Sequence, residues 1–301
     1  MWRRALLAGF AALCLAIPMA AQEVGGGYLD IYVVHVKPEK AADFDVIARK
    51  IADANRKNNG DRWLALESVY GEANTVAFIS HRDSYADIDK ATDVFMSAVN
   101  KAYGKEATQK LFNDFNSCLV SARSELRHRR WDLSRKPPAD EATYVKWIGE
   151  SRVIRTTAVH VKPGKSAEFE SILKEMKEAG DKVDNAQPTL VSQVYEGGNG
   201  TTYYVTSLRP GLGGYDNNPS MKQILGDDGY KKFLEGANDT IESTESMVFR
   251  YSPELSAPSE QVIAVAPAFW QPKTEMAATK KMTKPKKMTD TMQPAAEKEK
   301  Q

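Results

Sequence analysis

Two histidines occupy matching positions in a segment that the chain carries twice. Residues 32–44 read YVVHVKPEKAADF and residues 157–169 read TAVHVKPGKSAEF. Side chains alternate between the two faces of a strand, so His35 and His160 should lie opposite the flanking valines. Imidazole changes charge near neutral pH, so two such rings in one cavity would suit acid/base catalysis or half of a metal site. The competing interpretation is structural: each ring is hydrogen-bonded across the sheet or solvated at a cavity mouth.

Three more side chains are candidates for lining such a cavity: Glu67, Tyr70 and Tyr195. Glu67 falls within a predicted strand and could serve as a base, although a solvent-facing position is the alternative. Tyr70 and Tyr195 are equivalent in the two copies. An aromatic lining could also include Trp63, Tyr203 and Tyr204, but aromatic residues in strands are equally typical of a core.

Motifs for metal-dependent, nucleophilic or phosphate-binding chemistry are missing from the sequence. It has neither Cys-x-x-Cys nor His-x-x-x-His for zinc, and no Gly-x-Ser-x-Gly. We therefore expect no metal and no cofactor. Cys14 falls in the leader described below, which leaves Cys118 alone on an apolar segment, where a buried structural thiol is expected.

Charge gives little indication of a polyanionic partner. The formal net charge is +1, and an excess of one charge does not favour nucleic acid. A basic cluster follows the end of the first copy: Arg123, Arg127, Arg129, Arg130, Arg135 and Lys136. Arginines that alternate along a strand are typical of a solvated face, and that is the prediction here.

The repeat predicts the secondary structure of both copies. Residues 31–36 and 157–161 are short β-branched runs that end at Lys-Pro, as strands do before a turn. Phe44, Ile47 and Ile51 recur at helical spacing, as do their equivalents 125 residues later. A hairpin, a second helical region and a closing strand follow in each copy. The order strand, helix, strand, strand, helix, strand therefore occurs twice, which is the ferredoxin-like unit of an α+β protein.

Such a unit, whose first strand runs into Lys-Pro-Gly and a helix near Ala-Glu-Phe-Glu, resembles the dimeric α+β barrel families. These include antibiotic-biosynthesis monooxygenases and NIPSNAP-like and EthD-like proteins. The resemblance implies two sheets that face each other around a cavity, here as a pseudo-dimer within one chain. Some relatives that carry two ferredoxin-like units in one chain bind haem through a histidine on a helix. All four histidines of this chain fall in predicted strands, so a haem of that type is not expected.

We divide the chain into five parts. Residues 1–21 have the layout of a secretory signal peptide, with Arg3 and Arg4 before an apolar run. Residues 22–133 and 151–256 are the two repeats, 134–150 a linker, and 257–301 an extension with a Lys- and Met-rich tail expected to be disordered. The mature protein should be exported to the periplasm or the medium, with no stable membrane span. A small organic ligand and a homo-oligomer are left open as partners.

Two functions remain after this reading. The first is a non-catalytic barrel that binds a small molecule or has a structural role, because no catalytic set is recognisable. The second is a cofactor-independent monooxygenase or isomerase that acts on a small organic substrate in the barrel cavity, with His35 or His160 as proton acceptor. A hollow interior would favour the enzyme, and an interior filled by side chains would favour the first function.

Overall fold

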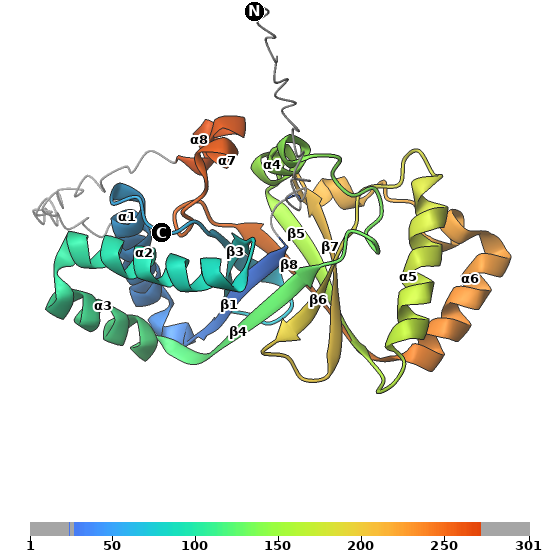
Figure 1. The fold of residues 1–301 in the computed structure, drawn as a ribbon, viewed down its shortest axis with the longest axis horizontal. Helices are drawn as coiled ribbons and strands as arrows, with labels where there is room; N and C mark the ends of the chain where they lie inside the picture. Colours follow the sequence, from blue (N-terminus) through green and yellow to red (C-terminus); the bar gives the residue numbers. More distant parts are fainter. Residues whose placement is uncertain (1–23, 25–26, 272–301) are drawn as a thin grey trace, which may run out of the picture.

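Eight strands close into a single antiparallel barrel in the order β1-β3-β2-β8-β5-β7-β6-β4 (Figure 1). The computed structural model describes residue 24 and residues 27–271. The predictions for the signal peptide and for the tail from residue 273 onward concern residues outside this part.

The two halves of the barrel are built from similar, but not identical, successions of elements. The first half has β1 (Tyr28–Val36), α1 (Ala41–Lys57), β2 (Leu64–Tyr70), β3 (Thr75–Arg82), α2 (Tyr85–Tyr103), α3 (Lys105–Ser117) and β4 (Leu119–Arg129). The second half has β5 (Val153–Val161), α5 (Ser166–Asp181), β6 (Leu190–Glu196), β7 (Thr201–Arg209), α6 (Met221–Thr240) and β8 (Ile241–Tyr251). The predicted strands, hairpins and first helices are all present. The second helical regions end before Leu119 and Ile241, and these two residues begin strands.

The two halves join at two seams, β2 with β8 and β4 with β6. Four antiparallel steps separate β1 from β5 around the barrel, so these strands run in the same direction. The ends of β1 and β5 therefore lie at the same end of the barrel. Beyond the seams, the first residues of β4 and β8 pair with only one neighbouring strand.

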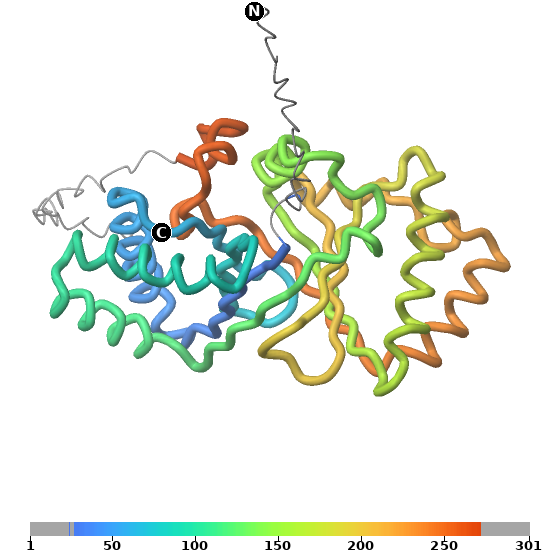
Figure 2. The backbone as a smooth tube through the Cα atoms, viewed as in Figure 1, coloured from blue at the N-terminus to red at the C-terminus, as the bar shows by residue number. Residues whose placement is uncertain are grey.

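The helices pack outside the barrel, α1 to α3 on one side and α5 and α6 on the other (Figure 2). Val34 and Val36 face Phe44 of α1, and Val159 and Val161 face Phe169 of α5 in the second half. The predicted alternation is confirmed: these valines meet the helices, and their sequence neighbours face the barrel axis. Burial of such apolar side chains contributes about 1.5–3 kcal/mol each.

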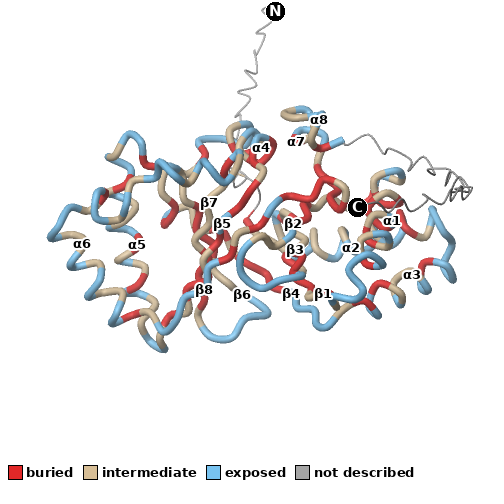
Figure 3. Tube along the Cα trace, turned by 180° about the vertical axis from the view of Figure 1, so that it is seen from behind, coloured by how far each residue is buried: buried red, intermediate tan, exposed pale blue. Residues whose placement is uncertain are grey.

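The barrel interior is largely packed with side chains. One apolar cluster there draws on strands of both halves: Ile31, Val33, Leu64, Leu66, Ala77, Ile154, Leu190, Met247, Phe249 and Tyr251. In Figure 3 buried residues run along the strands, and the outer faces of the helices are exposed. One core therefore spans both halves.

Two helices were absent from the sequence prediction. Helix α2 begins at Ser84, whose side chain accepts from the Asp87 amide, and lies over the first half only. The segment predicted as a linker contains α4 (Glu141–Glu150), capped by Asp140 in the same way. Tyr144 and Ile148 of α4 join the interior cluster, so this helix closes one end of the barrel (Figure 1).

The start of the C-terminal extension docks on the body, as predicted. It forms α7 (Glu260–Val265) and α8 (Pro267–Trp270). Trp270 is buried, and its indole donates to the Gly149 carbonyl at 3.0 Å. Cys118, at the end of α3, is also buried as predicted. Within the described part of the chain, no helix is long and apolar enough to cross a membrane.

Candidate functional site

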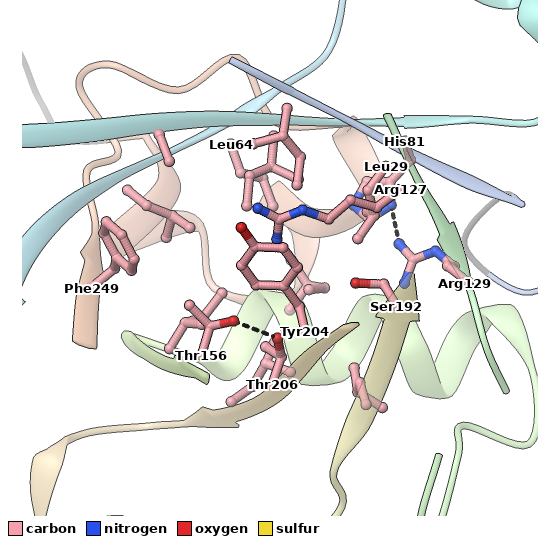
Figure 4. A pocket seen from close by; sticks show the side chains of 18 of the residues that line it. Leu29, Leu64, His81, Arg127, Arg129, Thr156, Ser192, Tyr204, Thr206 and Phe249 are labelled. Atoms are coloured by element: carbon pink, nitrogen blue, oxygen red, sulfur yellow. Dashed lines mark hydrogen bonds between the residues drawn. The ribbon is translucent and has the colours of Figure 1, made fainter. Parts of the chain in front are cut away.

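A small cavity of about 100 Å³ remains inside the barrel (Figure 4). Its walls are mainly the leucine, isoleucine, valine and phenylalanine side chains of the interior cluster. The polar members of the lining come from five strands: His81, Arg123, Arg127, Arg129, Thr156, Ser192, Tyr204 and Thr206. The volume is below the roughly 300–1,000 Å³ of typical ligand pockets. A large ring system therefore does not fit inside the barrel.

Glu125 organises one group of charges beside this cavity. Its carboxylate accepts from Arg127 at 2.8 and 2.6 Å, forms an ion pair with Arg123 at 2.9 Å, and accepts from the Tyr204 hydroxyl at 3.3 Å. The Arg127 guanidinium also stacks 3.2 Å from the centre of the Tyr204 ring. Burial raises the pKa of Tyr204, which keeps its hydroxyl a donor. The charges of Glu125 and Arg127 are thus matched inside the barrel.

Arg129 is held differently, at the end of the barrel that α4 closes. Its Nη2 donates to the Tyr144 hydroxyl at 2.6 Å and also contacts His81 Nδ1. Its guanidinium lies over the rings of Tyr144 and Trp131. Among the described residues, Arg129 forms no ion pair with a carboxylate, and its buried Nε has no hydrogen-bond partner. The charge is therefore surrounded by neutral groups.

The prediction that these alternating arginines form a solvated face is wrong for the two arginines in the middle of the cluster. Arg127 and Arg129 are 8% and 5% exposed, and both point into the barrel. The strand that carries them is not an outer edge, because β4 pairs with β6 and so closes the barrel. Arg123, farther along the same face, is half exposed.

The two repeated histidines lie on the inward-facing side of their strands, as predicted, but outside the cavity lining. His35 Nδ1 lies 3.1 Å from the Thr75 hydroxyl, and His160 Nδ1 lies 3.0 Å from the Thr202 hydroxyl. His35 also pairs with Glu72 at 3.2 Å. Both rings are at the barrel end opposite α4. The matching threonine contacts support a structural role, and catalysis by the histidines stays a prediction.

The three other candidates also lie away from the barrel cavity. Glu67 shares the outer face of β2 with Ala65 but is itself exposed. Partial desolvation raises its pKa, and the charge of Arg49 opposes this. Tyr70 is 63% exposed at the end of the β2–β8 seam, where it pairs with Val248 after a bulge. Tyr195 is half exposed and stacks on His128 outside the barrel. Of the aromatic residues that the sequence analysis considered, Tyr204 does line the cavity.

A larger pocket of about 480 Å³ lies outside the barrel, between the sheet of the first half and helices α1 to α3. Six aromatic side chains line it: Tyr32, Trp63, Phe78, Phe95, Phe112 and Phe115. Tyr32 and Phe78 are cross-strand neighbours on its floor, and Trp63 meets Phe95 of α2 edge to face. Its volume is within the range of small-molecule sites.

One end of this outer pocket is polar. Arg82 donates to both carboxylate oxygens of Asp61, at 2.9 and 2.7 Å, and lies 3.5 Å from Asp30. Arg82 is buried, yet its Nε has no partner among the described residues. Burial raises the pKa of Asp30, and the attraction of Arg82 opposes this. Ser80 pairs with Asp30 across β1 and β3 and completes the polar end.

The second half does not repeat the residues of the outer pocket. Thr157 and Val205 occupy the cross-strand positions that Tyr32 and Phe78 occupy in the first half. A short 3₁₀ segment, Leu212–Tyr215, follows β7 where α2 follows β3. The sequence offered two signals for this pocket. One is the aromatic excess of the first copy, and the other is the helical spacing of Ile88, Phe95 and Val99 in α2, which the prediction did not use.

Within the described residues, no group of three His, Cys, Asp or Glu side chains could hold a metal ion.

Comparison with known proteins yields similarity of fold alone. No family model and no curated relative matches the chain. Among solved structures, an anthrone oxidase-like protein matches with 13% identity and a TM-score of 0.49, over 75% of this chain and 91% of its own. Independently of these matches, the described chain forms a closed barrel of eight antiparallel strands.

Two further solved structures match over a comparable share of the chain. A chlorite dismutase from Candidatus Nitrospira defluvii matches with 8% identity and a TM-score of 0.44, over 81% of this chain and 96% of its own. A heme-binding protein from Thermus thermophilus matches with 12% identity and a TM-score of 0.43, over 76% of this chain and 93% of its own. Likeness at this level assigns neither a residue nor a reaction to this α+β barrel.

Proposed function

We propose that the protein binds a small, flat organic molecule in the outer pocket of the first half. The single observation that carries this proposal is the pocket of about 480 Å³, with aromatic walls and one polar end. The aromatic pair Tyr32 and Phe78 lies at one end of the floor. The polar pair Asp30 and Ser80 comes next along the strands, and Arg82 follows it. A ring system with a hydroxyl or carbonyl group at one end would match this order, because aromatic faces stack on rings and the buried Arg82 supplies a donor.

In this proposal the barrel interior is not the binding site for the flat organic molecule. Its cavity of about 100 Å³ is too small for such a molecule. Side chains of both halves fill most of the space, which favours the non-catalytic interpretation of the barrel itself. We infer that the two halves are ferredoxin-like units of one duplication, because their strands pair in corresponding order. In this proposal the barrel is the rigid support, and the first half carries the binding site.

A blocking substitution tests the site. Ala91 of α2 lines the outer pocket, and Ala102 of the same helix is exposed. We expect Ala91→Trp to fill the pocket and weaken binding of 2-naphthol and related hydroxylated bicyclic aromatics at least about tenfold, a loss of about 1.4 kcal/mol. Ala102→Trp, the same change on the solvent face, should bind as the parent does. Calorimetric titration measures both.

Equal binding by the two variants, or no saturable binding to the parent, would refute the site.

Proton transfer in the same pocket is the second candidate function. Asp30 faces the pocket, and burial raises its pKa, which makes its carboxylate a stronger base. It could accept a proton from a ligand hydroxyl or an activated carbon, as a cofactor-independent isomerase or monooxygenase requires. Asp30→Asn should then retain ligand binding and abolish conversion. Conversion at the parental rate by this variant would exclude Asp30 as the base.

A further inference from the structure

The interior of the barrel carries more positive charge than its own residues neutralise. Three arginines line the cavity, and Glu125 is the one carboxylate that forms ion pairs with any of them in the described structure. Glu125 is shared between Arg123 and Arg127, and no carboxylate of the described residues forms an ion pair with Arg129. A buried charge without a partner is costly in a protein interior.

Arg129 also has a neighbour suited to holding an anion. It is paired with Ser192 across β4 and β6, and both side chains line the cavity. The described residues provide no hydrogen bond to the Ser192 hydroxyl, although Ser192 is buried. Figure 4 shows both side chains at the same end of the cavity, with Arg127 above the Tyr204 ring nearby. A guanidinium and a free hydroxyl are together suited to a carboxylate.

The rest of the lining restricts the size and character of that anion. The cavity of about 100 Å³ is smaller than the roughly 150 Å³ that admits benzene. Its other walls are apolar, with Ile154, Met247 and Phe249 among them. An inorganic oxyanion would leave these walls without contacts, whereas a short alkyl chain would pack against them.

We propose that the barrel cavity binds a short-chain aliphatic carboxylate, whose charged group meets Arg129 and Ser192 and whose chain fills the apolar remainder. This ligand is distinct from the aromatic molecule of the outer pocket and does not depend on it.

A route into the cavity lies along the same strand. The first residues of β4 pair with β1 only, since pairing with β6 begins at Leu126. Arg123 lies in this stretch, is 50% exposed and also lines the cavity. Between solvent and Arg129 this face carries Arg123 and Arg127 with Glu125 between them, two positive charges to one negative. The net positive charge along this strand attracts anions.

Titration of the full-length mature protein with sodium propionate tests the proposal, with sodium chloride at equal ionic strength as reference. The expected result is saturable binding, with a rise in melting temperature that chloride does not give. Arg129→Gln should weaken propionate binding about 10- to 100-fold, the effect of losing a hydrogen bond to a charged group. Arg155→Gln, at an exposed position on β5, should bind as the parent does.

A second variant keeps the test decisive if Arg129→Gln does not fold. Ala77→Leu extends an apolar side chain into the cavity and leaves Arg129 in place, so it should also abolish propionate binding. In the parent, the methyl group of bound propionate should show nuclear Overhauser contacts to the Met247 methyl. Absence of these contacts, equal stabilisation by chloride or nitrate, or unchanged binding in Ala77→Leu would overturn the proposal.

Discussion

At the scale of single residues, strand alternation predicts which face a side chain occupies but not how deep it lies along the barrel. His35 and His160 are on the predicted inward-facing side, yet they sit at one end, against Thr75 and Thr202. The alternation of Arg127 and Arg129 in the sequence is typical of a solvated strand face, but both side chains are buried. Arg127 stacks on Tyr204 of the other half, and Arg129 donates to Tyr144 of α4. No local pattern in the strand reveals partners that lie elsewhere in the sequence.

The polar end of the outer pocket should influence how stability depends on pH. Burial raises the folded-state pKa of Asp30 above its ordinary value of 3.8. The folded protein therefore keeps the Asp30 proton to a higher pH than the unfolded chain does. As a result, the contribution of Asp30 to the free energy of unfolding falls as the pH rises from about 3.8 through the folded-state pKa. Asp30→Asn removes that loss. The free energy of unfolding of the variant, relative to the parent, should therefore increase across this interval.

Urea denaturation at a series of pH values measures this difference. Asp114→Asn, at an exposed ion pair on α3, serves as control and should show almost no such trend. A difference that stays constant or falls with rising pH would show that the Arg82 attraction, not burial, dominates at Asp30.

At the scale of elements, hydrophobic periodicity predicted the helices that have a counterpart in the other copy. Phe44 and Phe169 mark α1 and α5 at the same place in the repeat. Helices α2 and α4 occur only once, so the repeat could not indicate them. Helix α4 was hidden further by the proline pair before it, which is typical of a linker. These unrepeated helices shape the two cavities: α2 covers the outer pocket, and α4 closes the barrel.

Helix α4 should therefore contribute to stability through one face. Ile148 is 5% exposed and packs in the interior cluster, whereas the Lys146 side chain is 65% exposed. Ile148→Ala should lower the free energy of unfolding by about 2–5 kcal/mol, since it leaves a cavity at the closed end of the barrel. Lys146→Ala should change it by less than about 0.5 kcal/mol. Similar small effects of both changes in chemical denaturation would mean that α4 is a loosely attached linker.

At the scale of the whole molecule, the sequence repeat predicted two similar halves, and the structure shows why they depend on each other. The interior cluster draws Ile31 and Leu66 from the first half and Ile154 and Phe249 from the second. Each half alone would expose this apolar face together with the strand edges that form the seams. The repeat could predict that the sheets face each other, but not that the strands at both seams pair and close the barrel.

The last prediction follows from that mutual dependence. A fragment of residues 27–133, expressed alone, should not persist as a folded monomer, because the inner face of its sheet would be exposed and β2 and β4 would each be unpaired at one edge. We expect it to be unfolded, or to form a homodimer in which a second copy replaces the missing half. Light scattering after gel filtration gives the mass, and circular dichroism gives the strand content. Added fragment 151–271 should restore a complex of one copy of each. A cooperatively melting monomer of the first fragment would show that each half has a sufficient core of its own, formed by its valines and its helices, and that the shared interior adds little.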